Sequence, residues 1–240
     1  MTGTRALVTG ASSGIGRAVA LALAGRGARV WAVGRKLETL GELEQDARDV
    51  PGSVESLVCD LTDDDQVRGL ATSAGSQLAG LDVLVHAAGV HSMGAIESAS
   101  VDELDWQYRS NVRAVYLLTQ ALLPLLRASR ADVVFVNSSA GLRSRAVVGQ
   151  YSATKHALKA IADTLRQEVN ASGIRVLSVY PGRTASPLQE SVHRHEGLAY
   201  RPELLLQPED VASVVLAALD LSRTAEVTDV SVRPFVGGQR

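Results

Sequence analysis

The sequence predicts one doubly wound α/β domain, in which a seven-stranded parallel sheet carries helices on both faces. Short apolar runs rich in β-formers alternate along the chain with longer segments of helical period. The strand runs are apolar throughout, which indicates burial on both faces and therefore a parallel sheet. The 240 residues contain no repeat, low-complexity tract or linker that would divide them, so we expect a single domain over 1–240.

The elements follow one another in βα order from the N-terminus. The first apolar run ends in a glycine-rich turn, and an Ala- and Leu-rich helix follows directly; later runs repeat this alternation. The predicted strands are 5–9, 28–33, 54–59, 82–85, 132–137, 174–179 and 227–232. The predicted helices are 15–26, 37–48, 64–78, 101–128, 151–171 and 211–219.

The segment 187–207 interrupts this alternation with Pro187, Gly197, Pro202 and mixed charge. It follows the sixth strand, close to the edge where such sheets bind their ligands. We therefore expect a substrate lid there, although a plain surface connection fits the composition almost as well.

Composition excludes several classes of protein. Hydrophobic residues make up 46% and charged residues 21%, as in folded globular proteins, and the net charge of −2 argues against a general nucleic-acid or anionic-membrane surface. The single cysteine, Cys59, excludes an internal disulfide, and its apolar run predicts a buried structural thiol. No stretch approaches the ~20 apolar residues that span a bilayer, and no secretory segment precedes the first strand, so we expect a cytoplasmic protein without a membrane partner.

The turn after the first strand has glycines at 10, 14 and 16, directly before a helix. Gly10 allows the sharp turn, Gly14 lets the backbone approach a pyrophosphate, and Gly16 lets helix and strand pack closely. The helix N-terminus then offers free N–H groups to the anion. Glycine spacing alone leaves a turn without a ligand equally plausible, but the strand–turn–helix context favours a dinucleotide.

The end of the second strand indicates which dinucleotide is bound. A site for NAD usually has an acid there, on the ribose 2′-hydroxyl, whereas this chain has Arg35 and Lys36. Arg35 can bind a 2′-phosphate through charge-assisted hydrogen bonds, with Arg17 as a possible second contact, so we expect NADP(H). The alternative is that Arg35 and Lys36 simply begin a solvated helix, which leaves the missing acid unexplained.

Tyr151 and Lys155 lie four residues apart at the start of a helix and therefore share one face. A tyrosine with its ordinary pKa of ~10 is a weak acid–base catalyst at neutral pH, and a neighbouring ammonium lowers that pKa. Such a pair is also common on surfaces by chance, so its meaning depends on the motifs around it.

With the glycine-rich turn, this pair makes the sequence resemble the short-chain dehydrogenase/reductase family over nearly its whole length. The further shared motifs are Asp60-Leu61 after the third strand, Ala87-Ala88-Gly89 after the fourth, Asn111 on the long helix, and Pro181-Gly182 with Thr184 and Ser186 after the sixth. The set in this order is specific, although each motif alone is weak. The resemblance implies a single-domain Rossmann fold and an enzyme that needs no metal.

The resemblance also assigns roles to residues. The catalytic residues would be Asn111, Ser138, Tyr151 and Lys155. Together with Arg35, the residues expected to bind NADP(H) are Gly10, Ser12, Ser13, Gly14, Ile15, Gly16, Asp60, Leu61, Ala87, Ala88, Gly89, Tyr151, Lys155, Pro181, Gly182, Thr184 and Ser186. Tyr151 would transfer a proton to or from the substrate oxygen, Ser138 would stabilise charge on that oxygen, Lys155 would bind the nicotinamide ribose, and Asn111 would position a water of a proton relay.

Two serines compete for the catalytic position, and two residues depart from the family pattern. Ser138 has Gly141 three residues on and Tyr151 thirteen on, as in the family, whereas Ser139 misses both spacings by one. His86 stands where the family most often has asparagine, and we expect a buried, hydrogen-bonded histidine there. Ser186 replaces the more usual threonine, which is a mild change.

The leading functional hypothesis is therefore an NADP(H)-dependent oxidoreductase acting on a ketone or secondary alcohol. The alternative is an NADP-binding sensor without turnover, and a sugar-modifying or epimerising branch is disfavoured by the short C-terminal part. The family resemblance implies a homodimer or homotetramer that pairs through helices 101–128 and 151–171.

The sequence offers further candidates near the substrate. We expect His193, Arg194 and His195 to be solvated lid residues, since a two-residue spacing suits no metal site. His91, Arg143 and Arg145 are candidates for the substrate entrance. The arginines 143, 145 and 194 would favour an acidic substrate or merely face water.

Overall fold

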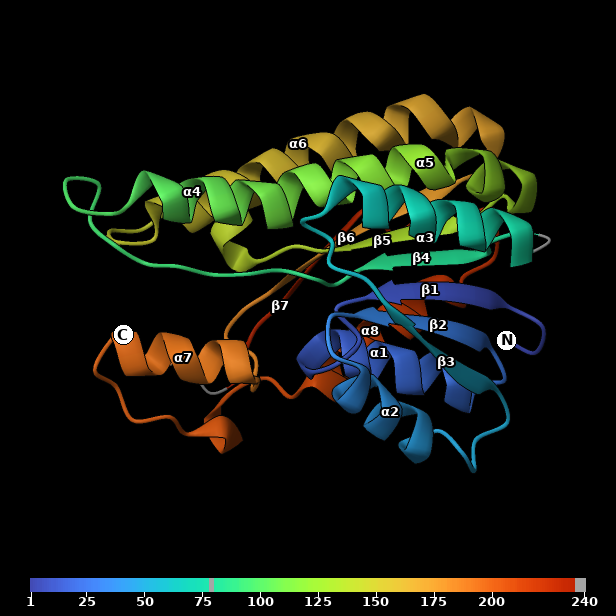
Figure 1. Ribbon diagram of the computed structural model, residues 1–240, viewed down its shortest axis with the longest axis horizontal. Helices are drawn as coiled ribbons and strands as arrows, with labels where there is room; N and C mark the ends of the chain where they lie inside the picture. The colour runs from blue at the N-terminus through green and yellow to red at the C-terminus, as the bar shows by residue number, and fades with distance from the viewer. Residues whose placement is uncertain (78–79, 236–240) are drawn as a thin grey trace.

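The computed structural model describes residues 1–77 and 80–235, which form one seven-stranded sheet with helices on both faces (Figure 1). All neighbouring strands pair in parallel, in the order β3-β2-β1-β4-β5-β6-β7. The strands are β1 Arg5–Thr9, β2 Arg29–Gly34, β3 Ser53–Val58, β4 Val83–His86, β5 Asp132–Val136, β6 Arg175–Pro181 and β7 Asp229–Val232. The predicted doubly wound parallel fold is confirmed.

The helices form two layers around this sheet, as Figure 1 shows. One face carries α1 Gly14–Gly25, α2 Leu37–Asp46 and α8 Pro208–Leu219. The other face carries α3 Asp64–Gln77, α4 Val101–Tyr108, α5 Ala114–Ser129 and α6 Gly149–Val169. Residue 78, where the sequence predicted the end of the third helix, lies outside the described residues.

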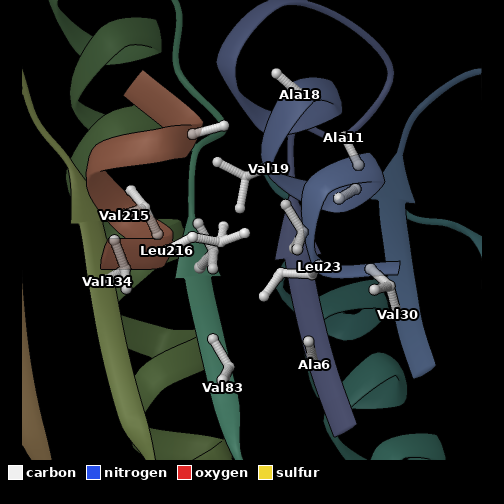
Figure 2. Packing of buried hydrophobic residues seen from close by; sticks show 14 of the residues in the cluster. Ala6, Ala11, Ala18, Val19, Leu23, Val30, Val83, Val134, Val215 and Leu216 are labelled. Carbon is white, nitrogen blue, oxygen red and sulfur yellow. The ribbon is translucent and has the colours of Figure 1, made fainter. Parts of the chain in front are cut away.

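Each face of the sheet has its own apolar core. Under α1 and α8, side chains such as Val19, Leu23 and Val215 pack onto the strands (Figure 2). On the other face, Leu118, Leu122 and other side chains of α3, α5 and α6 cover the opposite sides of the same strands. Central strands β4 and β5 are buried along their whole length, which is why their sequences lack polar alternation.

The long helix expected over 101–128 is interrupted. After α4, the residues Arg109–Arg113 form one π-helical turn, and α5 then continues to Ser129. Asn111 lies in the middle of this turn, and its side chain hydrogen-bonds to a neighbouring loop. Single π-turns inside helices are rare and occur mostly at functional sites.

The segment expected to act as a lid has its own short helix. Ser186 accepts a hydrogen bond from the Gln189 N–H and so caps α7, which spans Pro187–His195. A parallel bridge between Thr184 and Leu206 joins the two ends of the segment. Figure 1 shows α7 beside the main body, on the side of the sheet where the carboxyl end of β6 lies. Within the described ranges no helix has the length and apolar character needed to cross a membrane.

Candidate active site

A cavity of about 570 Å³ lies at the carboxyl ends of the strands, between the loops that follow β1, β2, β4, β5 and β6. This volume falls within the roughly 300–1,000 Å³ of small-molecule sites. Every residue expected to bind the cofactor lines this cavity, and so do Ser138, Tyr151 and Lys155. The topology thus brings together side chains that are up to about 175 positions apart in the chain, from Gly10 to Ser186.

The glycine-rich turn packs so closely against neighbouring backbone that no side chain fits at Gly10 or Gly16. A Cβ at Gly10 would lie 2.7 Å from the Ala88 backbone, and one at Gly16 would lie 2.3 Å from the Gly10 carbonyl oxygen. Gly10 and Gly14 have positive φ angles of 66° and 53°, which favour glycine. The Ser13 side chain makes no capping hydrogen bond, so the first N–H groups of α1 face the cavity uncapped. These features fit a dinucleotide pyrophosphate.

At the adenosine end, Arg35 follows β2, is exposed and lines the cavity. The cavity wall there has no acid on β2, which suits a phosphorylated ribose. Arg17 instead pairs with Asp46. The Asp60 carboxylate accepts hydrogen bonds from the Thr62 N–H and hydroxyl at 2.9 and 2.8 Å, so its side chain holds the loop after β3.

Tyr151 lies in the first turn of α6, where its ring is half-buried against the cavity. Burial raises the pKa of Tyr151 to about 12, and the nearby Ser138 side chain opposes this rise. Ser138 itself sits at the end of β5, where its oxygen accepts a hydrogen bond of 3.1 Å from the Ala140 N–H. Ser139 is exposed and begins a short 3₁₀ turn. The geometry therefore favours Ser138 over Ser139.

Lys155 is buried one turn further along α6. Its Nζ lies 5.7 Å from the centroid of the Tyr151 ring and donates a hydrogen bond of 3.3 Å to the Val136 carbonyl. Burial lowers the pKa of Lys155 to about 8. The expected lowering of the Tyr151 pKa by Lys155 does not appear, since burial of the phenol is the largest effect on its pKa.

Asn111 does not line the cavity; its side chain holds the cavity wall from behind. Its Oδ1 accepts a hydrogen bond of 2.8 Å from the Val90 N–H, and its Nδ2 donates to the Val90 carbonyl and to the Thr154 hydroxyl. Thr154 precedes Lys155 on α6, so Asn111 ties the loop after β4 to the helix that carries Tyr151. Neither Val90 nor Thr154 was predicted from sequence, since a π-turn has no recognisable sequence signal.

The histidines differ from one another in their surroundings. His86 is buried as expected, with its Nε2 2.8 Å from the Thr119 hydroxyl and its ring stacked on Phe135. The expectation of a solvated His193 is wrong: this ring is buried between the Gln189 carbonyl and the edge of the Tyr200 ring. His195 and Arg194 are exposed as expected.

At the substrate end, the structure separates the candidate residues. His91 and Arg145 line the cavity, whereas Arg143 is exposed and does not. Two arginines contact one largely buried carboxylate of the lid, that of Glu196, whose side chain is 11% exposed. Glu196 had no signal in the sequence, because its partners are 13 and 51 positions away. Among the described residues no cluster of side chains is suited to a metal ion.

Comparison with known proteins agrees with this site. A family model described as short chain dehydrogenase matches residues 4–197. The chain belongs to the short-chain dehydrogenase/reductase family. Membership makes it an oxidoreductase of a family that uses nicotinamide cofactors.

Relatives within this family align over most of the chain. An uncharacterized short-chain type dehydrogenase/reductase of Sinorhizobium fredii is 37% identical over 97% of this chain and 93% of its own. The NADPH-dependent 3-dehydrocapnine reductase of Ornithobacterium rhinotracheale is 39% identical over 74% of this chain and 64% of its own. A short-chain dehydrogenase of Shigella flexneri, solved with NADP, is 29% identical, with a TM-score of 0.89 over 96% of this chain and 97% of its own.

Proposed function

We propose that this short-chain dehydrogenase/reductase transfers hydride between NADP(H) and the carbon of a ketone or secondary alcohol. The observation that carries the proposal is that Tyr151 and Ser138, which is near enough to affect the phenol, line the same cavity as the glycine-rich turn. A phenol and a serine hydroxyl that meet at one point can both address a single substrate oxygen.

In the reductive direction, Tyr151 donates a proton from its hydroxyl to the carbonyl oxygen. A pKa raised to about 12 keeps this phenol protonated at neutral pH, which suits a proton donor. Ser138 donates a hydrogen bond to the same oxygen and stabilises the charge that develops on it. A bound nicotinamide cofactor supplies the hydride. Lys155 binds the ribose hydroxyls and returns a proton towards Tyr151, while Asn111 fixes α6 against the loop after β4.

Arg35 supports NADP(H) as the cofactor. Its guanidinium is exposed at the end of β2 and lines the cavity where a ribose 2′-phosphate would lie. The Shigella flexneri relative was solved with NADP, and the Ornithobacterium rhinotracheale reductase is NADPH-dependent. The segment 187–207 would act as the substrate lid, since Leu188, Gln189 and Val192 of α7 line the cavity.

We also propose that the chain works as a cytoplasmic homodimer or homotetramer. The helices α4 and α5 expose Trp106, Tyr108 and Tyr116, which are large apolar side chains suited to a subunit interface. Size-exclusion chromatography with light scattering would test this assembly, and a monomer would contradict it.

NADPH oxidation over a panel of ketones, aldehydes, quinones and acyl-thioester ketones tests the function. Tyr151→Phe should lower turnover by about 10²–10⁴-fold, as loss of a general acid does, while NADPH binding stays unchanged. Tyr108→Phe is the matched control: it removes a phenol hydroxyl outside the cavity and keeps the ring that would pack at the proposed interface, so it should keep full activity. Activity that survives Tyr151→Phe would contradict the mechanism. NADPH binding without turnover of any compound would favour a sensor.

A further inference from the structure

The wall of the cavity beside Tyr151 combines apolar side chains with positive charge. Val148, Leu188 and Val192 supply the apolar part, while Arg145 and Arg183 supply two guanidinium groups. The carboxylate that lines the cavity, Asp60, lies after β3 at the adenosine end. Among the described lining residues, none at the substrate end is acidic.

Glu196, at the end of α7, neutralises only one of these two arginines. Arg183 faces its carboxylate with two nitrogens, Nη2 at 2.9 Å from Oε1 and Nη1 at 2.7 Å from Oε2. Burial raises the pKa of Glu196, but Arg183 and Arg145 together lower it below its usual value, so the carboxylate stays ionised. One carboxylate against two guanidinium groups leaves one positive charge in excess.

Arg145 carries this excess charge. Within the described part of the chain, its guanidinium hydrogen-bonds only to Glu196, through Nη2 at 2.7 Å from Oε1. Its side chain is 54% exposed and lines the cavity, and its Nε and Nη1 make no hydrogen bond to the described residues. Arg183, by contrast, uses both of its terminal nitrogens on Glu196.

Arg145 is also placed close to the reacting groups. Burial is the largest cause that lowers the pKa of His91 to about 4, and the positive charge of Arg145 is the second. The centroids of the His91 and Tyr151 rings lie 4.5 Å apart. The loop that holds Arg145 has Val147 at a positive φ of 58°, an unfavourable conformation for a β-branched residue. Backbone strain of this kind is found mainly at functional sites. The Gly94 N–H donates to the Val147 carbonyl at 2.9 Å and fixes the loop in place.

We propose that the substrate is a carbonyl or hydroxyl compound that carries a carboxylate or a similar anionic group, and that Arg145 binds this group beside Tyr151. This inference rests on the proposed function. Arginine suits the task because its planar donors match the two oxygens of a carboxylate. The apolar side chains Val148, Leu188 and Val192 would then contact the carbon chain between the anion and the carbonyl.

Matched pairs of oxo acids and their methyl esters test the proposal: pyruvate, acetoacetate, levulinate and 4-acetylbenzoate, each against its ester. Within each pair the ketone is the same and only the charge of the acid group differs. From one pair to the next, the distance between the ketone and the acid group changes. Turnover with NADPH is measured first. Binding is then measured by calorimetry on Tyr151→Phe loaded with NADPH, which reports recognition even where chemistry is absent.

We expect at least one oxo acid to exceed its ester by about tenfold to a hundredfold in kcat/KM or in affinity, as a charged hydrogen bond provides. Arg145→Gln should remove this preference, and Arg145→Lys should restore part of it. The matched control is Arg194→Gln, which makes the same charge change on an exposed lid residue that is paired only weakly with Glu190. The control should keep the preference.

Several outcomes would overturn the proposal. No preference for the charged member of any pair, in turnover or in binding, would exclude an anion site. A preference that is equal in wild type and Arg145→Gln would place the anion elsewhere. A loss of NADPH affinity in Arg145→Gln would show that Arg145 binds the cofactor and not the substrate. Oxo acids that bind with this preference, while no compound of the wider panel is reduced, would contradict the proposed function and keep the anion site.

Discussion

The imidazole of His91 packs against the phenol ring of Tyr151, with the ring centroids 4.5 Å apart and the ring planes at 57°. His91 lies next to Val90 in the loop that Asn111 holds, so the contact links that loop to α6. Burial, and to a smaller extent the charge of Arg145, lowers the pKa of His91 to about 4. The imidazole is therefore neutral near pH 7. It therefore positions the phenol by packing and supplies no charge.

His91→Ala should accordingly lower kcat without changing NADPH affinity. Aromatic pairs contribute about 0.5–1.5 kcal/mol, so we expect a loss of about twofold to tenfold. His91→Phe should restore most of the activity, since it keeps a ring on Tyr151. Steady-state kinetics from pH 6 to 8 would check this. A His91→Phe variant as slow as His91→Ala, or with a shifted pH profile, would show that the imidazole takes part in proton transfer.

Arg35→Ala should remove the preference for NADPH. Charge-assisted hydrogen bonds contribute about 1.5–3 kcal/mol, so its NADPH affinity should fall by about tenfold to a hundredfold while its NADH affinity stays constant. Fluorescence titration of both cofactors would measure this, with Arg48→Ala as a control for an exposed arginine outside the cavity. Equal affinity of the wild type for NADPH and NADH would contradict the assignment.

The stability of the protein should decrease on the acid side partly because of His86. Burial lowers the pKa of His86 from 6.5 to about 3, so the folded chain keeps this imidazole neutral. In the unfolded chain it gains a proton as the pH falls through about 6.5. The unfolded state thus binds more protons in this range, and the free energy of unfolding falls with the pH, by up to about 1.4 kcal/mol per pH unit.

His86→Asn should flatten this dependence. We expect urea denaturation between pH 7 and pH 5 to show a shallower loss of stability than in the wild type, with His91 still contributing in the same direction. The exposed His195→Asn is the control and should leave the slope unchanged. A slope in His86→Asn as steep as in the wild type would show that His86 is not held neutral by the fold.

Much of the fold was predictable because local signals determine it. Apolar runs such as β4 and β5 indicate strands buried on both faces, and Gly10 and Gly16 mark backbone approaches that tolerate no Cβ. The parallel topology then brings the ends of β1, β4, β5 and β6 to one edge, so the cavity-lining residues could be listed from sequence. The choice of Ser138 over Ser139 rests on the spacing of the family motif, and both serines line the cavity.

The remaining features depend on contacts between distant segments. The π-turn at Asn111 arises where this side chain bonds to Val90, which is 21 positions away. Burial of His193 depends on Tyr200, which lies beyond the end of α7 and packs against its ring, and the spacing of residues within the helix does not reveal this contact. Glu196 looks in sequence like any charged lid residue, and only the folded chain brings Arg145 and Arg183 to it.

Val147 is a site at which the native residue should reduce stability. Its φ of 58° is a left-handed conformation that costs a β-branched residue about 1–2 kcal/mol, whereas asparagine tolerates it. The Val147 side chain is 45% exposed, so little packing is lost on substitution. Val147→Asn should therefore raise the melting temperature by about 2–4 °C, as expected for roughly 1 kcal/mol in a chain of this size. Leu142→Asn, at an equally exposed position of the same loop with φ −110°, should give no increase. A melting temperature that is unchanged or lower in Val147→Asn would show that the loop before α6 is not strained.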